Sequence, residues 1–228
     1  MHIHIRSLSF ITLIIISNNY FLLAQEFNDF GIWTQASIDK KIAKKTILNG
    51  QIQGRLSENS TAFTRLSFGL GLTYKINKSF RLSVGSVFIR RSENPGELLS
   101  NRHRLYADLT YRKNFNRLVL NYRVRFQSQQ TDIYSSEMGM YPDYFLRNKV
   151  SLKYDWNLFL SPFISEELFI PTNNLTEVNL SRSRSIAGME YHLNKRNDLQ
   201  IYFLYQRDLY NKPVSNLYTL GLGYSLKL

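Results

Sequence analysis

The stretch FTRLSFGLGLTYK, residues 63–75, alternates between large apolar side chains and small or polar ones. Alternation at period two places successive side chains on opposite faces of a β-strand. One face would carry Thr64, Leu66, Phe68, Leu70, Leu72 and Tyr74, and the other Phe63, Arg65, Ser67, Gly69, Gly71, Thr73 and Lys75. A helix would need apolar spacings of three and four residues, which this stretch does not show. The pattern therefore predicts a strand with one apolar face.

The same alternation recurs from Thr46 onward, and residues 118–127 are a second clear example. Bacterial single-chain membrane barrels have even strand numbers. The segment around Trp33 alternates most weakly, so dropping it would leave ten strands, and one missed strand would make twelve. We therefore predict ten to twelve strands, with the uncertainty at the N-terminal end. The pattern marks strands at residues 29–38, 46–56, 63–75, 80–91, 102–113, 117–127, 145–156, 160–169, 182–193, 198–207 and 215–228.

A repeated apolar-x-Tyr pattern marks one end of five of these strands. The tyrosines are Tyr74, Tyr111, Tyr154, Tyr191 and Tyr224. The first four lead into short polar turns, whereas the opposite strand ends meet longer polar loops. Short turns at one rim and long loops at the other are typical of outer-membrane barrels, whose short turns face the periplasm. The five tyrosines and Trp156 are therefore predicted to form an aromatic girdle at a membrane interface.

The direction of the polarity distinguishes a membrane barrel from a soluble, lipocalin-like barrel. The polar face carries Arg, Asn, Gln and Gly, and the apolar face carries Leu and large aromatic residues almost without interruption. A charge at mid-span on a lipid-facing surface would cost about 2–4 kcal/mol, so this apolar face favours lipid outside. Glu166 is the exception, since strict alternation points it outward, although a bulge near Pro162 would correct its phase. The predicted fold is thus all-β, an antiparallel transmembrane β-barrel.

Residues 1–24 have the layout of a signal peptide. Arg6 supplies the positive segment, residues 8–16 (LSFITLIII) the apolar core, and Ala24 the small residue before cleavage. The apolar core is too short for a membrane-spanning helix, which needs roughly 20 residues. We therefore expect residues 1–24 to be removed after export. Residues 25–228 would then form the barrel domain in the cell outer membrane, in contact with its lipid.

Composition excludes several classes of protein. The chain contains no cysteine, which excludes a lipid-anchored cysteine, a disulfide scaffold and thiolate metal sites. Its net charge of +12 is typical of nucleic-acid binding. However, the basic residues alternate with apolar ones instead of clustering, and an exported chain rarely meets nucleic acid. We therefore expect no nucleic-acid partner.

Several local motifs occur in order along the chain. They are Gly31-Ile32-Trp33, 101–104 (NRHR), 121–126 (NYRVRF), Pro162 leading to 167–169 (ELF), and 181–184 (SRSR) leading to 188–191 (GMEY). In this order they resemble the exported family catalogued as domain of unknown function 2490, over essentially all of the mature chain. The resemblance implies an outer-membrane barrel without an established activity.

The C-terminal strand resembles an outer-membrane assembly signal. Thr219, Gly221, Tyr224 and Leu226 place polar, glycine, aromatic and apolar residues at the spacing of that signal, although the chain ends in Leu228 where an aromatic residue is usual. The resemblance implies that the barrel-assembly machinery recognises this strand.

Catalytic chemistry finds little support in the sequence. His103 opens one strand at the long-loop rim and His192 closes another at the short-turn rim, so these histidines cannot share a metal ion or a catalytic set. Glu166 and Glu167 are adjacent on a strand and therefore face opposite sides. No serine is obviously placed beside His103 as a nucleophile, and no metal-ligand spacing or phosphate-binding loop is present. We expect no enzymatic activity, no cofactor and no metal site.

The polar face predicts a lumen rich in arginine. Counting strand positions from the short turns places Glu167 level with Lys149 and Arg184. The predicted lumen charge cluster consists of Glu167, Lys149, Arg184, Arg125, Arg123 and Arg182. These charges could form a structural ion-pair lattice, which is our preferred interpretation, or line a narrow channel or uptake component that favours anions. An outer-membrane enzyme acting on lipid is the third alternative, and the sequence does not identify a ligand.

Overall fold

The computed structural model describes residues 27–92, 100–131, 142–173, 180–209 and 214–228. Within this part of the chain the regular secondary structure is β-strand throughout. None of the described residues belongs to a helix long and apolar enough to cross a membrane. The predicted signal peptide, residues 1–24, lies outside the described residues.

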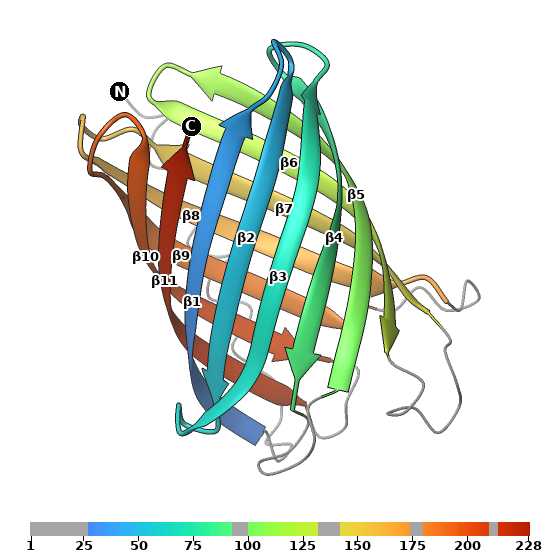
Figure 1. Ribbon diagram of the computed structural model, residues 1–228. Coiled ribbons are helices and arrows are strands. Elements are labelled where there is room, and N and C mark those ends of the chain that lie inside the picture. The colour runs from blue at the N-terminus through green and yellow to red at the C-terminus, as the bar shows by residue number, and fades with distance from the viewer. Residues whose placement is uncertain (1–26, 93–99, 132–141, 174–179, 210–213) are drawn as a thin grey trace, which may run out of the picture.

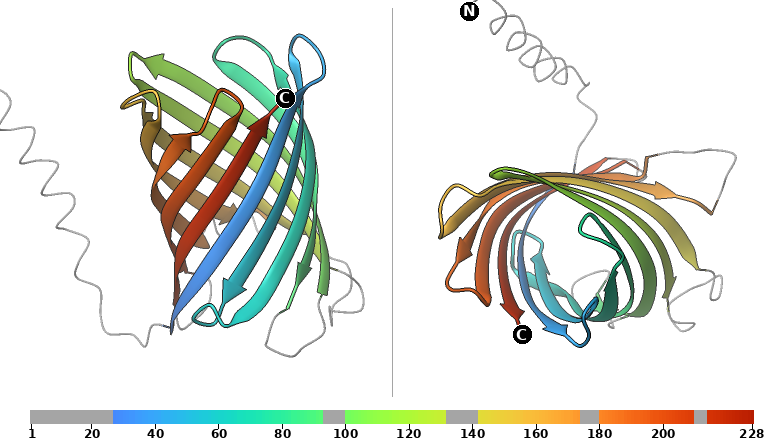
Figure 2. Two further views of the ribbon diagram at one scale, coloured as in Figure 1. Left: turned by 60° about the vertical axis from the view of Figure 1, so that its left-hand side comes forward. Right: turned by 90° about the horizontal axis from the view of Figure 1, so that it is seen from above.

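The described strands form one closed barrel (Figures 1 and 2). Each strand is antiparallel to the next along the chain, and the first and last strands pair in parallel to close the sheet. The fold confirms the prediction of an all-β barrel with ten to twelve strands. The eleven strands are β1 (Phe27–Lys41), β2 (Thr46–Ser57), β3 (Ala62–Lys75), β4 (Phe80–Arg91), β5 (Ser100–Phe115), β6 (Leu118–Thr131), β7 (Asp143–Tyr154), β8 (Leu160–Pro171), β9 (Arg182–His192), β10 (Asn197–Asp208) and β11 (Ser215–Lys227).

The two rims of the barrel differ in the length of their connections. We call the rim that holds the C-terminus the short-turn rim (Figure 1, top). Its connections span residues 42–45, 76–79, 116–117, 155–159 and 193–196. At the opposite, long-loop rim the connections span residues 58–61, 92–99, 132–142, 172–181 and 209–214. Except for the turn at 58–61, these spans follow the predicted division into short and long connections.

The N-terminal segment around Trp33, the weakest of the eleven predicted strands, is a full strand. β1 is 15 residues long and pairs with both β2 and β11. Trp33 is only 3% exposed and points into the lumen, while Thr34 and Ala36 lie on the outer wall. The alternation is weak because the largest aromatic side chain faces inward. An odd strand number follows, which makes the closing pair parallel and starts β1 at the long-loop rim.

The outer wall is apolar, as the alternation predicts. Leu70 is 68% exposed, whereas Gly69 and Gly71 on either side of it are buried. Every strand carries at least one exposed large apolar residue. An exposed apolar surface of this extent is unfavourable in water and suits lipid. Near the short-turn rim the residues of the predicted girdle Tyr74, Tyr154, Trp156, Tyr191 and Tyr224 are exposed, and Tyr111 is half-buried.

A β-bulge changes the facing of one residue at the long-loop end of β3. The register of β3 with β2 shifts, so that Arg55 pairs with Arg65 but Leu56 pairs with Phe63. Phe63, predicted on the lumen face, is instead 54% exposed on the outer wall. The extra residue, Thr64, reverses the alternation beyond it, because one inserted residue moves every following side chain to the other face.

The bulge in β8 that would have turned Glu166 toward the lumen does not occur. β8 keeps its register with β7 and β9 along its whole paired length, so there is no bulge near Pro162. Glu166 therefore stays on the outer surface, where the Ser185 hydroxyl donates a hydrogen bond to its carboxylate. This hydrogen bond from the neighbouring strand gives an outward carboxylate a local partner.

Two lumen tyrosines lie against glycines on neighbouring strands. A Cβ atom added at Gly221 would meet the Tyr202 ring at 2.0 Å, and one added at Gly85 would lie 2.4 Å from the Tyr106 hydroxyl. The missing side chains make room for these rings, which then narrow the interior of the barrel. The lumen of an eleven-stranded barrel is therefore filled in part by its own aromatic residues.

The side-chain orientations in β2 and β3 predict that a new arginine destabilises the barrel on its outer wall but not in its lumen. In Leu70→Arg the charge enters the outer wall, which should cost about 2–4 kcal/mol of insertion free energy. In Gln51→Arg, which lies near the same height in the lumen, the charge stays in a polar environment. We expect refolding into lipid vesicles, followed by heat-modifiable gel migration, to show less folded barrel for Leu70→Arg only. Equal losses in both variants would contradict the assigned facing.

Candidate functional site: an arginine-rich lumen

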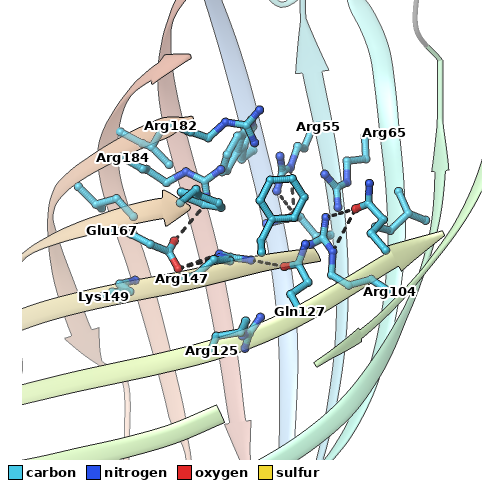
Figure 3. Close-up of a pocket in the computed structure, with 18 of the residues that line it drawn as sticks. Arg55, Arg65, Arg104, Arg125, Gln127, Arg147, Lys149, Glu167, Arg182 and Arg184 are labelled. Atoms are coloured by element: carbon cyan, nitrogen blue, oxygen red, sulfur yellow. Dashed lines mark hydrogen bonds and ion pairs between the residues drawn. The ribbon is translucent and has the colours of Figure 1, made fainter. Parts of the chain in front are cut away.

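The barrel encloses a cavity of about 830 Å³ whose lining residues extend from the long-loop rim past mid-height. Figure 3 shows part of this lining. Strands β2 to β7 and β9 carry basic residues into the cavity by alternation, and β9 supplies both arginines of its SRSR motif. Among the described residues that line it, eleven are basic and three are acidic. The basic residues are Arg55, Arg65, Arg91, Arg102, Arg104, Arg123, Arg125, Arg147, Lys149, Arg182 and Arg184, and the acidic residues are Asp143, Glu167 and Asp208.

Glu167 of β8 is the centre of one ion-pair cluster in the lumen. Its side chain is almost fully buried, with 2% of the residue exposed. Its Oε1 accepts hydrogen bonds from Arg123 at 2.6 Å and from Arg147 at 2.8 Å, and its Oε2 lies 3.6 Å from Arg184 Nη1. One carboxylate therefore serves three guanidinium groups.

Two further ion pairs involve residues on neighbouring strands. Arg125 donates to both oxygens of Asp108 at 2.6 and 2.7 Å, which is the bidentate geometry that makes such pairs strong. Arg182 pairs with Asp208 near the long-loop rim. Each of these pairs is locally neutral, so neither offsets the positive charge around Glu167.

The β2–β3 side of the lumen is not neutralised in the same way. Arg55 lies directly opposite Arg65 in the sheet register. Arg55 donates to Gln53 Oε1 at 2.7 and 3.0 Å, and Arg104 donates to Gln129 Oε1 at 2.7 Å. The Arg65 Nε is buried and has no hydrogen-bond partner among the described residues. These three arginines form no ion pair with any described residue.

Aromatic rings pack against several of the guanidinium groups in the lumen. The Arg55 guanidinium lies 3.6 Å from the centroid of the Trp33 ring, and Arg147 lies 4.3 Å from that of Phe169. Arg184 lies between these rings, at 5.1 and 5.0 Å. Cation–π contacts of this kind hold a guanidinium plane in place while leaving its N–H edges free to donate.

The structure brings together only part of the charge cluster that the sequence predicts. Lys149 and Arg184 flank Glu167 directly in the sheet register, and Arg123 bonds to it. Two members lie elsewhere, because Arg125 pairs with Asp108 and Arg182 with Asp208. The predicted cluster leaves out Arg147. Arg147 lies opposite Phe169, two residues along β8 from Glu167. Its long side chain reaches back to the Glu167 carboxylate.

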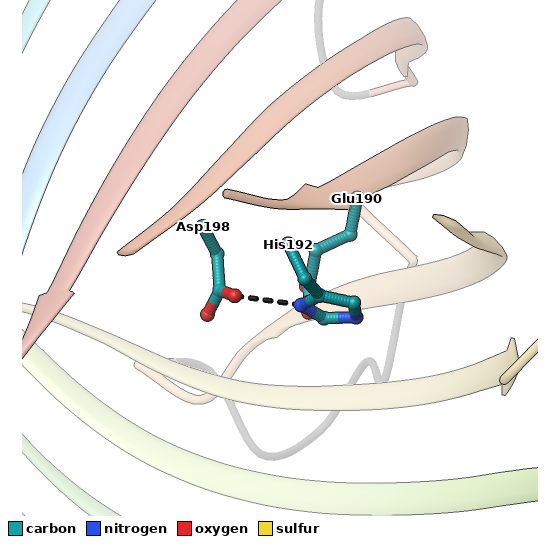
Figure 4. Close-up of side chains that lie close together, drawn as sticks. All are labelled: Glu190, His192 and Asp198. Atoms are coloured by element: carbon teal, nitrogen blue, oxygen red, sulfur yellow. Dashed lines mark hydrogen bonds and ion pairs between the residues drawn. The ribbon is translucent and has the colours of Figure 1, made fainter. Parts of the chain in front are cut away.

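A second group of side chains converges in the lumen at the short-turn rim (Figure 4). One ligand atom each of Glu190, His192 and Asp198 lies within 4.8 Å of the other two. Sequence analysis missed this group because no single strand contains all three residues. The available signal was Glu190-x-His192, two residues on one face of a strand, followed by Asp198 directly after a short turn.

Two solved structures that are similar to this chain are outer-membrane-type barrels at low sequence identity. A NanC porin is 12% identical, with a TM-score of 0.50, over 78% of this chain and 86% of that one. The β-domain of the Bordetella autotransporter BrkA is 12% identical, with a TM-score of 0.48, over 81% of this chain and 84% of that one. The likeness to the porin concerns the fold alone. No curated protein matches this sequence.

A family model confirms the resemblance that the motifs indicate. The model described as "Protein of unknown function (DUF2490)" matches residues 30–217, a range that starts in β1 and ends in β11. The match therefore covers all eleven strands of the closed barrel at least in part. The chain belongs to the DUF2490 family.

Proposed function

We propose that this protein is an integral barrel of the outer membrane that forms a narrow, anion-favouring channel or uptake route. The observation that carries the proposal is the pair Arg55 and Arg65, which face each other in the lumen without a carboxylate partner among the described residues. The proposed role is to let anions cross the membrane through the lumen, and it involves no catalysis.

Two physical costs favour an anion beside these arginines. Like charges placed directly opposite each other in a sheet are destabilising. A buried donor without an acceptor also costs about 1–3 kcal/mol, and both Arg65 Nε and Trp33 Nε1 are such donors among the described residues. An anion in the cavity supplies negative charge and acceptor oxygens together. An excess of positive charge that is costly in the empty lumen thus becomes favourable when an anion enters.

The size and the chemistry of the cavity indicate the class of solute. A volume of about 830 Å³ lies within the range of about 300–1,000 Å³ that is usual for small-molecule sites. Guanidinium groups bind carboxylate and phosphate groups through two parallel hydrogen bonds. The lining amides of Gln53, Gln127 and Gln129 add neutral polar contacts. A small organic solute that carries a carboxylate or phosphate group fits this combination.

Two features support an outer-membrane location: the apolar outer surface of the barrel and the targeting signals predicted from the sequence. The exposed side chains of Phe68, Leu70 and Leu72 belong to an apolar surface that surrounds the barrel, and aromatic residues gather at one of its edges. The predicted signal peptide and the predicted assembly signal in β11 supply a route to that membrane. Lipid around the wall and water in the lumen together satisfy the two faces of every strand.

Ion selectivity in planar bilayers tests the channel. Under a potassium chloride gradient, the reversal potential of the wild-type barrel should show that chloride is more permeant than potassium. The double variant Arg55→Gln and Arg65→Gln should move the reversal potential toward zero, because it removes the uncompensated charge. Arg117→Gln, an exposed turn residue, is the control for a surface charge and should change little. A wild-type barrel that prefers potassium, or that does not conduct, would contradict the proposal.

The Glu167 cluster supports a second candidate, a structural barrel whose ion pairs close the lumen. A lattice of this kind needs mutual neutralisation, and the cluster provides it for at least one of its three arginines. The candidate accounts for the β6–β9 side of the lumen. It does not account for Arg55, Arg65 and Arg104, which bond to amides or to no described group.

Glu167→Gln separates the two candidates. Removing a buried carboxylate from among three cations should cost about 3–5 kcal/mol if the lumen there is dry. A wet lumen would reduce the cost to about 0–1 kcal/mol, the value of an exposed pair. We expect a lower unfolding temperature together with a stronger chloride preference. Glu166→Gln on the outer surface is the matched control: it should leave the chloride preference unchanged and should not lower the unfolding temperature, because it removes a charge from the lipid-facing wall. A large loss of stability in a barrel that never conducts would support the structural candidate instead.

A further inference from the structure

The group at the short-turn rim is built on a rigid frame. Glu190 and His192 lie two residues apart on β9, so both face the lumen, and Asp198 of β10 lies directly opposite His192 in the register. The turn between the strands is fixed because the Asn194 side chain accepts hydrogen bonds from the backbone N–H groups of Arg196 and Asn197 at 2.9 and 3.0 Å. The three side chains are therefore positioned by paired backbone and not by a loose loop.

The distances within this group match those between the ligands of a single metal ion. His192 Nδ1 lies 3.6 Å from Glu190 Oε1 and 2.6 Å from Asp198 Oδ1. A tetrahedral ion with ligands at about 2.0–2.2 Å holds neighbouring ligand atoms about 3.3–3.6 Å apart. The first distance already fits this range. The second has to lengthen, because a proton now occupies the contact between the imidazole and the carboxylate.

Each of the three side chains is also held at its other polar atom. Glu190 Oε2 accepts from the Gln200 amide at 2.7 Å, and Asp198 Oδ2 accepts from the Lys227 ammonium. His192 Nε2 lies 3.1 Å from the hydroxyl oxygen of Ser161. Metal ligands in proteins usually have outer partners of this kind, which orient the ligand atom toward the ion.

The hydrogen bonds available to Ser161 are compatible with the histidine tautomer that a metal needs. The Ser161 hydroxyl can donate to Asp155 Oδ1, 3.2 Å away, and accept from the Nε2–H of His192. When a metal ion displaces the proton between Nδ1 and Asp198, the imidazole keeps its proton on Nε2 and directs the Nδ1 lone pair toward the space between Glu190 and Asp198. This is the arrangement found in metal sites, where the second ring nitrogen donates to an oxygen.

We propose that Glu190, His192 and Asp198 bind a first-row divalent metal ion of the Zn²⁺ class in the lumen at the short-turn rim. One imidazole nitrogen and two carboxylate oxygens are donor types that such an ion binds, with further positions left to water. This inference does not rest on the anion preference of the larger cavity.

The ammonium group of Lys153 competes with a metal ion for Glu190, but it can pair with Asp155 instead. Lys153 Nζ lies 3.1 Å from Glu190 Oε1, the oxygen that would face the metal, and 4.0 Å from Asp155 Oδ1. A bound divalent ion repels the ammonium group, and Lys153 can then move fully to Asp155. The exchange keeps both carboxylates neutralised, so the competing lysine lowers the affinity without blocking the site.

Ser161, His192 and Asp198 also follow the order of a hydrolase triad, with the serine next to Nε2 and the aspartate next to Nδ1. Ser161 is only 1% exposed, so a substrate carbonyl has no approach to its hydroxyl oxygen. His192 is the more accessible of the two residues. Access therefore favours a small ion at the histidine over an ester at the serine.

Zinc titration of the purified, folded barrel in detergent micelles tests the site. Calorimetry with Zn²⁺ alone should detect about one ion per wild-type chain. His192→Asn should abolish this binding, and Ser161→Ala should weaken it about 10–100-fold, the usual effect of removing an outer partner. His103→Asn is the matched control, since His103 lies on the outer wall near the opposite rim, and it should bind like wild type.

Two results would overturn the proposal: no saturable binding by the wild type, or equal binding by wild type and folded His192→Asn. Heat-modifiable gel migration establishes which variants are folded. If His192→Asn does not fold, X-ray absorption of the zinc-loaded wild type decides. It should show one imidazole nitrogen together with oxygen ligands at about 2.0–2.2 Å. A coordination shell without imidazole would overturn the proposal equally.

Discussion

Closure of the sheet is the constraint on which the other features of this barrel depend. β1 pairs with β2 on one side and with β11 on the other, so the described sheet has no open edge. In lipid, backbone N–H and C=O groups have no water to bond to, and only a closed sheet satisfies them all. An eleven-stranded sheet can close only through one parallel pair. Closure also sends every second side chain into a narrow interior, where polar residues must find partners.

The interior meets this demand unevenly. On the β6–β9 side, Glu167 and Asp108 neutralise part of the surrounding positive charge through short ion pairs. On the β2–β3 side, Arg55 and Arg65 lie opposite each other. Arg55 bonds to the Gln53 amide and packs on the Trp33 ring, whereas the buried Arg65 Nε has no hydrogen-bond partner among the described residues. A lattice evolved only to fill the barrel would distribute its acids more evenly. The uneven charge is what the proposed anion passage explains.

The sequence was sufficient for the strands and their faces because period-two alternation is a local property. It predicted that Leu70 faces outward and that Glu167 lies level with Lys149 and Arg184. It was wrong at Phe63, because strict alternation was extended through a bulge that moves this residue to the other face. It undervalued β1, because Trp33 packs inward against Arg55 and thereby weakens the alternation of that strand. It also missed sites that depend on pairing between strands, such as Asp198 opposite His192.

Anomalous diffraction from crystals grown in bromide tests the central claim most directly, because it locates anions without relying on transport. An anion-favouring lumen predicts bromide between Arg55 and Arg65, within hydrogen-bond reach of the guanidinium groups, and its loss in the double variant with Gln at both positions. Bromide found only on the outer surface and at the loops, with the arginines unoccupied by any anion, would contradict the claim.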